Sequence, residues 1–179
     1  ISLFISFCST STFGVEFKGK FIQGHFIIGK TNPSLKITID KKKVKVSKNG
    51  YFAFGIEKDR KLDIVITENE KIIIKKIKKR KYNVQKIEGL PKKKVTPPEE
   101  FYARIKRENK LIGLAREVHS DLSFFKDKFI IPVDNAIITG VYGSQRILNG
   151  IPKWPHYGLD FAQKKGTPIK AMNNGIVTL

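Results

Sequence analysis

The segment WPHYGLDFA, residues 154–162, holds the two side chains whose types and spacing point most directly to chemistry. His156 and Asp160 stand four positions apart, with Pro155 before them and Gly158 between them. A neutral imidazole and an ionised carboxylate are both ligands that zinc accepts. The pair is therefore a candidate for two metal ligands, although so short a pattern also arises by chance.

The backbone must bend if both side chains hold one ion. In an extended strand, residues i and i+4 share a face but lie about 13 Å apart, whereas each zinc ligand lies about 2 Å from the metal. Gly158 gives the chain freedom to bend, and Pro155 places His156 at the entrance of a strand. We expect Tyr157, on the other face, either to line a cleft or to serve as a core aromatic.

The charge balance indicates an attraction to anionic surroundings. The net charge is +19, but lysines far outnumber the arginines that grip phosphate bidentately. We therefore expect no nucleic-acid partner, and we favour a general affinity for anionic polymers. The sequence leaves the oligomeric state open.

The first residues, ISLFISFCSTSTFG, favour export. An apolar run followed by small polar residues is typical of a secretory signal peptide, and residues 1–14 are interpreted as the remnant of one. The run is too short to span a bilayer, so we expect no integral membrane span in the mature chain and a location in the periplasm or cell envelope. A buried first strand is the alternative.

Residues 15–88 alternate between short strands and turns. The stretches FIQGHFIIG, LKITI, KVKV, YFAFGI, LDIVIT, KIIIKKI and YNVQKI are β-branched or aromatic. Seven strands at this spacing predict a β-sandwich. The basic run 75–81 is interpreted as the solvated end of a strand, with a polyanion patch as the alternative.

Residues 89–128 are expected to form a linker and a connecting helix. The linker is rich in proline and lysine. Within the helix, Phe101, Ile105, Ile112 and Ala115 form an apolar stripe that predicts packing against a neighbour. Residues 129–179 return to short strands divided by glycine and proline, so the expected fold is mainly β, with a second, antiparallel β domain after the helix.

This last region resembles the start of an M23 (LytM/lysostaphin-like) zinc metallopeptidase domain. The resemblance lies in TGVYGSQRILNGIPKWPHYGLDFAQKKGTPIKAMNNGIVTL. It includes Gly143 and Arg146, the H-x-G-x-D run from His156 to Asp160, G-T-P at 166–168, and A-x-x-x-G-x-V from Ala171 to Val177. Residues 129–179 are therefore interpreted as a partial M23 peptidase domain. The sandwich, linker and helix resemble, more weakly, the N-terminal region of some bacterial M23 proteins.

The resemblance implies a zinc metalloendopeptidase that hydrolyses peptidoglycan peptides, with His156 and Asp160 as two zinc ligands. It implies a substrate- or loop-positioning role for Arg146. We also expect Tyr157, which stands beside His156, to contact substrate if it lines the cleft. Trp154 either stacks on substrate or packs over its loop.

The sequence departs from the family at its later H-x-H motif, which supplies the third ligand and the catalytic histidine. No histidine follows His156. We therefore expect no catalytic residue in this chain, and a general-base histidine beyond Leu179. The alternative is a degenerate M23-like domain that binds cell wall or regulates other wall hydrolases without catalysis.

Overall fold

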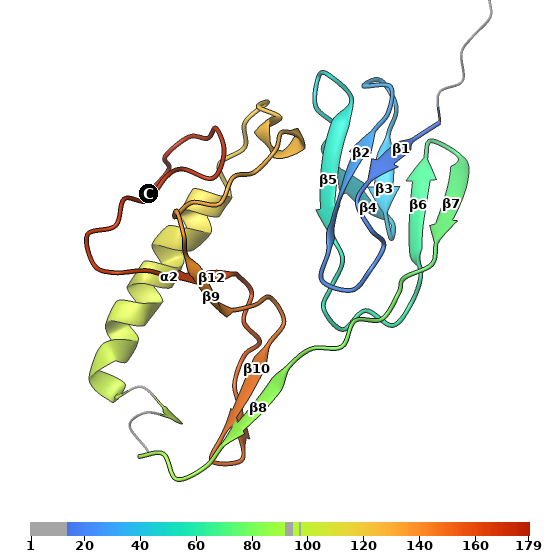
Figure 1. The fold of residues 1–179 in the computed structure, drawn as a ribbon. Coiled ribbons are helices and arrows are strands. Elements are labelled where there is room, and N and C mark those ends of the chain that lie inside the picture. Colours follow the sequence, from blue (N-terminus) through green and yellow to red (C-terminus); the bar gives the residue numbers. More distant parts are fainter. Residues whose placement is uncertain (1–13, 92–94, 97) are drawn as a thin grey trace, which may run out of the picture.

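The computed structural model describes residues 14–91, 95–96 and 98–179 (Figure 1). Short strands dominate, and one 15-residue helix, α2 (Tyr102–Arg116), stands among them. This confirms the expected mainly β fold. The predicted signal-peptide remnant lies outside the described residues except for Gly14.

Two antiparallel sheets face each other in the N-terminal part. The first has the strand order β1-β2-β5, and the second has the order β4-β3-β6-β7. The bounds of the first sheet are β1 (Glu16–Lys18), β2 (Phe26–Lys30) and β5 (Tyr51–Gly55). Those of the second are β3 (Ile37–Ile39), β4 (Lys42–Val44), β6 (Ile64–Glu68) and β7 (Lys71–Lys75). The quoted sequence stretches predicted all of these strands except β1.

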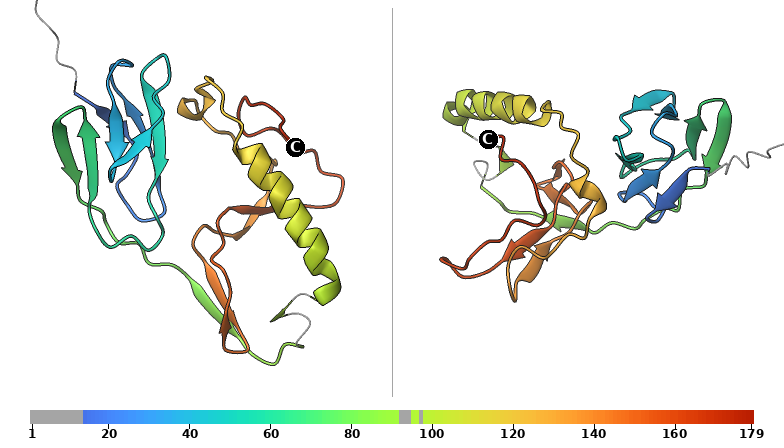
Figure 2. Two further views of the ribbon diagram at one scale, coloured as in Figure 1. Left: turned by 180° about the vertical axis from the view of Figure 1, so that it is seen from behind. Right: turned by 90° about the horizontal axis from the view of Figure 1, so that it is seen from above.

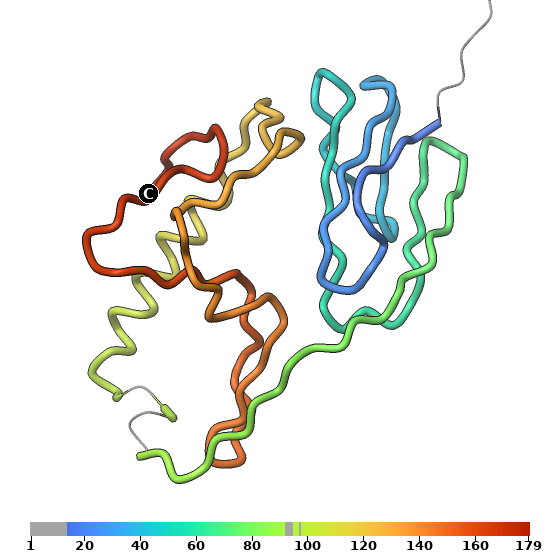
Figure 3. Tube along the Cα trace, in the orientation of Figure 1, coloured from blue at the N-terminus to red at the C-terminus, as the bar shows by residue number. Residues whose placement is uncertain are grey.

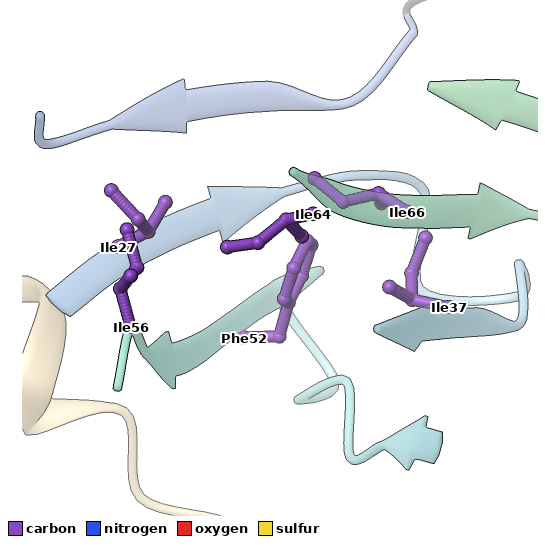
Figure 4. Close-up of a cluster of buried hydrophobic side chains, with 6 residues drawn as sticks. All are labelled: Ile27, Ile37, Phe52, Ile56, Ile64 and Ile66. Carbon is purple, nitrogen blue, oxygen red and sulfur yellow. The ribbon is translucent and has the colours of Figure 1, made fainter. Parts of the chain in front are cut away.

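A single apolar cluster fills the space between the two sheets (Figure 4). The first sheet and the residue after it contribute Ile27, Phe52 and Ile56, and the second contributes Ile37, Ile64 and Ile66. Inward side chains alternate with outward ones along β6, where Ile64 and Ile66 are buried and Val65 is exposed. The predicted β-sandwich is therefore present.

The hairpin turns contain left-handed backbone, which aspartate and asparagine adopt more readily than most other residues. Asp40 and Lys41 join β3 to β4 with φ of 48° and 67°, and Asn69 joins β6 to β7 with φ of 50°. Arg60 holds the Asp40 carboxylate through two hydrogen bonds, of 2.7 and 3.0 Å. This contact lowers the pKa of Asp40 and fixes the turn to the loop that precedes β6.

The strand β8 (Val84–Ile87) corrects one expectation. The sequence placed YNVQKI in the sandwich, but β8 pairs in parallel with β10 (Gln145–Leu148), more than fifty residues later in the chain. A local period of two identifies a strand but says nothing of its partner. The segment between β7 and β8 thus leads out of the sandwich, as the tube in Figure 3 shows.

The second β-rich region consists of two small sheets. The first has the order β11-β10-β8, where β11 (Ile151–Pro152) is antiparallel to β10. The second pairs β12 (Asp160–Ala162) with β9 (Ile137–Gly140), also antiparallel. The region is therefore mostly antiparallel, as expected, with the parallel β8–β10 pair as the departure.

The packing predicted for the helix is wrong. No residue of α2 is buried, and Phe101, Ile105 and Ile112 of the expected stripe remain 45%, 38% and 37% exposed. The helix runs along one side of the second region, away from the sandwich (Figure 2). The chain after it returns to the sandwich, where Asp121 forms an ion pair of 3.1 Å with Lys45.

No helix in the described ranges is long and apolar enough to cross a membrane.

Candidate metal-binding cleft

His156 and Asp160 lie on two sides of a bend. His156 follows β11 in an irregular stretch, the chain bends at Gly158, and Asp160 is the first residue of β12. The bend removes the separation that an extended strand would impose. The backbone bend that two ligands of one ion require here is therefore present.

The bend places one atom of each side chain beside the other. His156 Nε2 lies 3.2 Å from Asp160 Oδ1. This Nε2 atom is buried and has no hydrogen-bond partner in the part of the chain that the structure describes, so the contact lacks hydrogen-bond geometry. Two ligand atoms on one tetrahedral zinc lie about 3.3 Å apart, given bond lengths of about 2.0–2.1 Å. The separation therefore suits two ligands of one ion.

The backbone around His156 is fixed on both sides. The His156 N–H donates to the Ser144 carbonyl oxygen at 2.8 Å, and the Gly143 N–H donates to the His156 carbonyl oxygen at 2.7 Å. These two bonds continue the pairing of β10 and β11 beyond the strands themselves. They fix the backbone of His156 against the loop at residues 143–144.

Asp160 fits because its neighbour on β9 has no side chain. Asp160 is the register partner of Gly140, and the ladder is irregular just after this pair. A Cβ at position 140 would lie only 2.4 Å from Asp160 Oδ2. Sequence reasoning missed Gly140, because the register between β9 and β12 is a long-range property.

Tyr82 joins the end of the sandwich to this loop. Its ring packs on Gly143, where a Cβ would come within 2.1 Å of the ring, and φ of Gly143 is 84°. Lys58 and Arg80 lie 4.8 and 5.2 Å from the ring centroid. Burial raises the pKa of Tyr82. Because the Gly143 N–H donates a hydrogen bond to the His156 carbonyl oxygen, this packing supports the position of His156.

The pair opens into a cleft of about 580 Å³. Arg146 and Tyr157, the two predicted substrate contacts, both line it. Tyr157 is 61% exposed, with its ring 6.0 Å from that of Tyr142, so its role as a core aromatic is wrong. Trp154 also lines the cleft and is 86% exposed, which contradicts packing over its loop.

The segment around the start of β8 adds two lining residues that sequence reasoning missed. Asn83 and Gln85 reach the cleft from the start of β8. Only the unexpected pairing of β8 with β10 brings them there, so no local signal in the sequence identifies them.

Within residues 14–91, 95–96 and 98–179, no three His, Cys, Asp or Glu side chains gather where they could hold a metal ion. His156 and Asp160 form a pair and not a complete ligand set. Carboxylate and imidazole donors nevertheless suit zinc, so the residues present fit part of a zinc site.

In comparisons with known proteins, no family model matches this sequence, and no curated protein matches it.

Proposed function

We propose that His156 and Asp160 hold zinc in an M23-type metalloendopeptidase that hydrolyses peptidoglycan peptides in the cell envelope after export. One observation carries the proposal, the 3.2 Å separation of His156 Nε2 and Asp160 Oδ1 at the wall of an open cleft. The M23 resemblance of residues 129–179, of which His156 and Asp160 are part, is the source of the proposed reaction.

The chain's own residues would orient a peptide beside the ion. When bound, zinc polarises the scissile carbonyl and lowers the pKa of its bound water. His156 and Asp160 would hold the ion, while Arg146, Tyr157 and Trp154 line the cleft that would receive the peptide. A catalytic zinc site normally has three protein ligands, and the chemistry also needs a base. The family's H-x-H motif would supply both, and this sequence does not contain it.

The proposal is tested by titrating the chain with Co²⁺, which replaces zinc and reports its coordination by visible absorption. We expect one ion per chain, and at least tenfold weaker binding in His156→Ala and in Asp160→Asn, because each variant removes one of two ligands. His119→Ala is the matched control, since His119 is an exposed histidine outside the cleft. Circular dichroism verifies that all variants fold.

Two outcomes would count against the metal site. Equal Co²⁺ affinity in the wild type and both cleft variants would place the ion elsewhere. Absence of Co²⁺ binding by the wild type would favour the alternative, a degenerate domain that binds wall without catalysis.

A further inference from the structure

The floor of the cleft presents an arginine and an amide side by side. Arg146 on β10 is the register partner of Gln85 on β8. Partners in adjacent strands share a face, and both residues line the cleft. Ser144 and Asn83, which precede the two strands, line the cleft as well, as does Gln145.

The Arg146 guanidinium is available to a ligand. Arg146 is exposed, and among the ion pairs and side-chain hydrogen bonds found in the described ranges its guanidinium forms none. Lys153, the other cation of the cleft, instead donates to the Val95 carbonyl oxygen. Arg146 is thus the cleft's cation without a protein partner in this part of the chain.

The charge of the cleft favours an anionic ligand. Its lining carries the cations Arg146 and Lys153 and a single carboxylate, Asp160. A divalent ion at the His156–Asp160 pair would make the cleft still more positive. A ligand that reaches both the ion and Arg146 therefore gains from a negative charge at the arginine end.

We infer that this cleft recognises an acidic peptide, with a free carboxylate bound by Arg146 and Gln85. A guanidinium binds a carboxylate through two parallel hydrogen bonds, and the neighbouring amide can donate a third. Trp154 offers an exposed aromatic face for the apolar part of the same peptide. The inference rests on the proposed function, because it assumes that the ligand is a peptide lying across the cleft.

The test uses Trp154 as its own reporter, since it is the sole tryptophan of the chain. Two peptides, Ala-Glu-Lys-Ala and Ala-Gln-Lys-Ala, both acetylated and amidated, differ only in one carboxylate. Titrated at 0.15 M salt and followed by tryptophan fluorescence, the wild type should bind the glutamate peptide about tenfold more tightly. Arg146→Gln should abolish that preference, and Gln85→Ala should reduce it.

Two further variants separate charge from geometry. Arg146→Lys keeps the charge but loses the planar fork, so it should retain only part of the preference. Arg116→Gln removes an exposed arginine of α2 and should leave the preference unchanged. Equal binding of both peptides by the wild type, or an undiminished preference in Arg146→Gln, would overturn the inference. If inorganic phosphate competed as strongly as the glutamate peptide, the cleft would be a general anion site, and this result would overturn the inference as well.

Co²⁺ titration of the same variants separates this inference from the proposed function. Arg146→Gln should bind Co²⁺ as the wild type does. Co²⁺ binding at the His156–Asp160 pair without any carboxylate preference would overturn only the peptide inference. A carboxylate preference without Co²⁺ binding would overturn only the metal site.

Discussion

At the scale of single residues, the candidate metal site depends on a missing side chain. The Asp160 carboxylate occupies the space that a Cβ at position 140 would fill. The backbone of its neighbour His156 is held by hydrogen bonds on both sides. The present position of the carboxylate, 3.2 Å from His156 Nε2, therefore depends on glycine at 140.

Gly140→Ala should weaken Co²⁺ binding at least tenfold while leaving the protein folded, because the new methyl group pushes the carboxylate away from His156. Gly55→Ala is the matched control, since Gly55 also lies at the end of a strand and an added Cβ would meet nothing within 4 Å. Co²⁺ absorption titrations of the two variants test this. Unchanged affinity in Gly140→Ala would contradict the dependence of the site on glycine at 140.

Some residues of the candidate site can be identified from the sequence around them, and others cannot. His156, Asp160, Arg146 and Tyr157 were identified from nearby spacing and from resemblance, and the structure brings them to one cleft. Gly140 and Gln85 act through cross-strand partners distant in sequence, so only the sheet register reveals them.

At the scale of elements, the apolar pattern predicted where strands and a helix form better than what they contact. The β-branched and aromatic stretches identified seven strands, and one face of β6 is buried. The segment that carries the apolar stripe forms the predicted helix, α2, yet no residue of α2 is buried. A stripe shows that a helix can bury one face, whereas burial also requires a partner surface.

This difference predicts unequal costs for two isoleucine-to-alanine substitutions. Ile66 is fully buried between the two sheets, so Ile66→Ala should lower the free energy of unfolding by about 2–5 kcal/mol. Ile105→Ala on the exposed face of α2 should change it by less than about 1 kcal/mol. Urea unfolding measures both. A cost for Ile105→Ala as large as that for Ile66→Ala would show that the stripe is buried against a partner in solution.

At the scale of the whole molecule, the excess of positive charge is distributed over solvated lysines. The basic run 75–81 begins at the end of β7, which forms an edge of its sheet. Lys76, Lys78, Lys79 and Lys81 of this run are exposed. Charges placed in this way act mainly through their summed field and discourage pairing with other sheet edges.

Because the net charge of +19 is carried largely by lysines, the protein should have an affinity for anionic wall polymer, and salt should remove that affinity. The screening length falls from about 10 Å at 0.1 M salt to about 3 Å at 1 M. We therefore expect co-sedimentation with purified peptidoglycan sacculi to weaken at least tenfold between these two concentrations. Binding to sacculi that persists at 1 M salt would show that contacts other than charge, such as those of the cleft, hold the polymer.

Duplex DNA should bind no more tightly than about 1 μM at physiological salt, the limit of non-specific association. Nanomolar binding to DNA under those conditions would instead require a dedicated phosphate-binding surface.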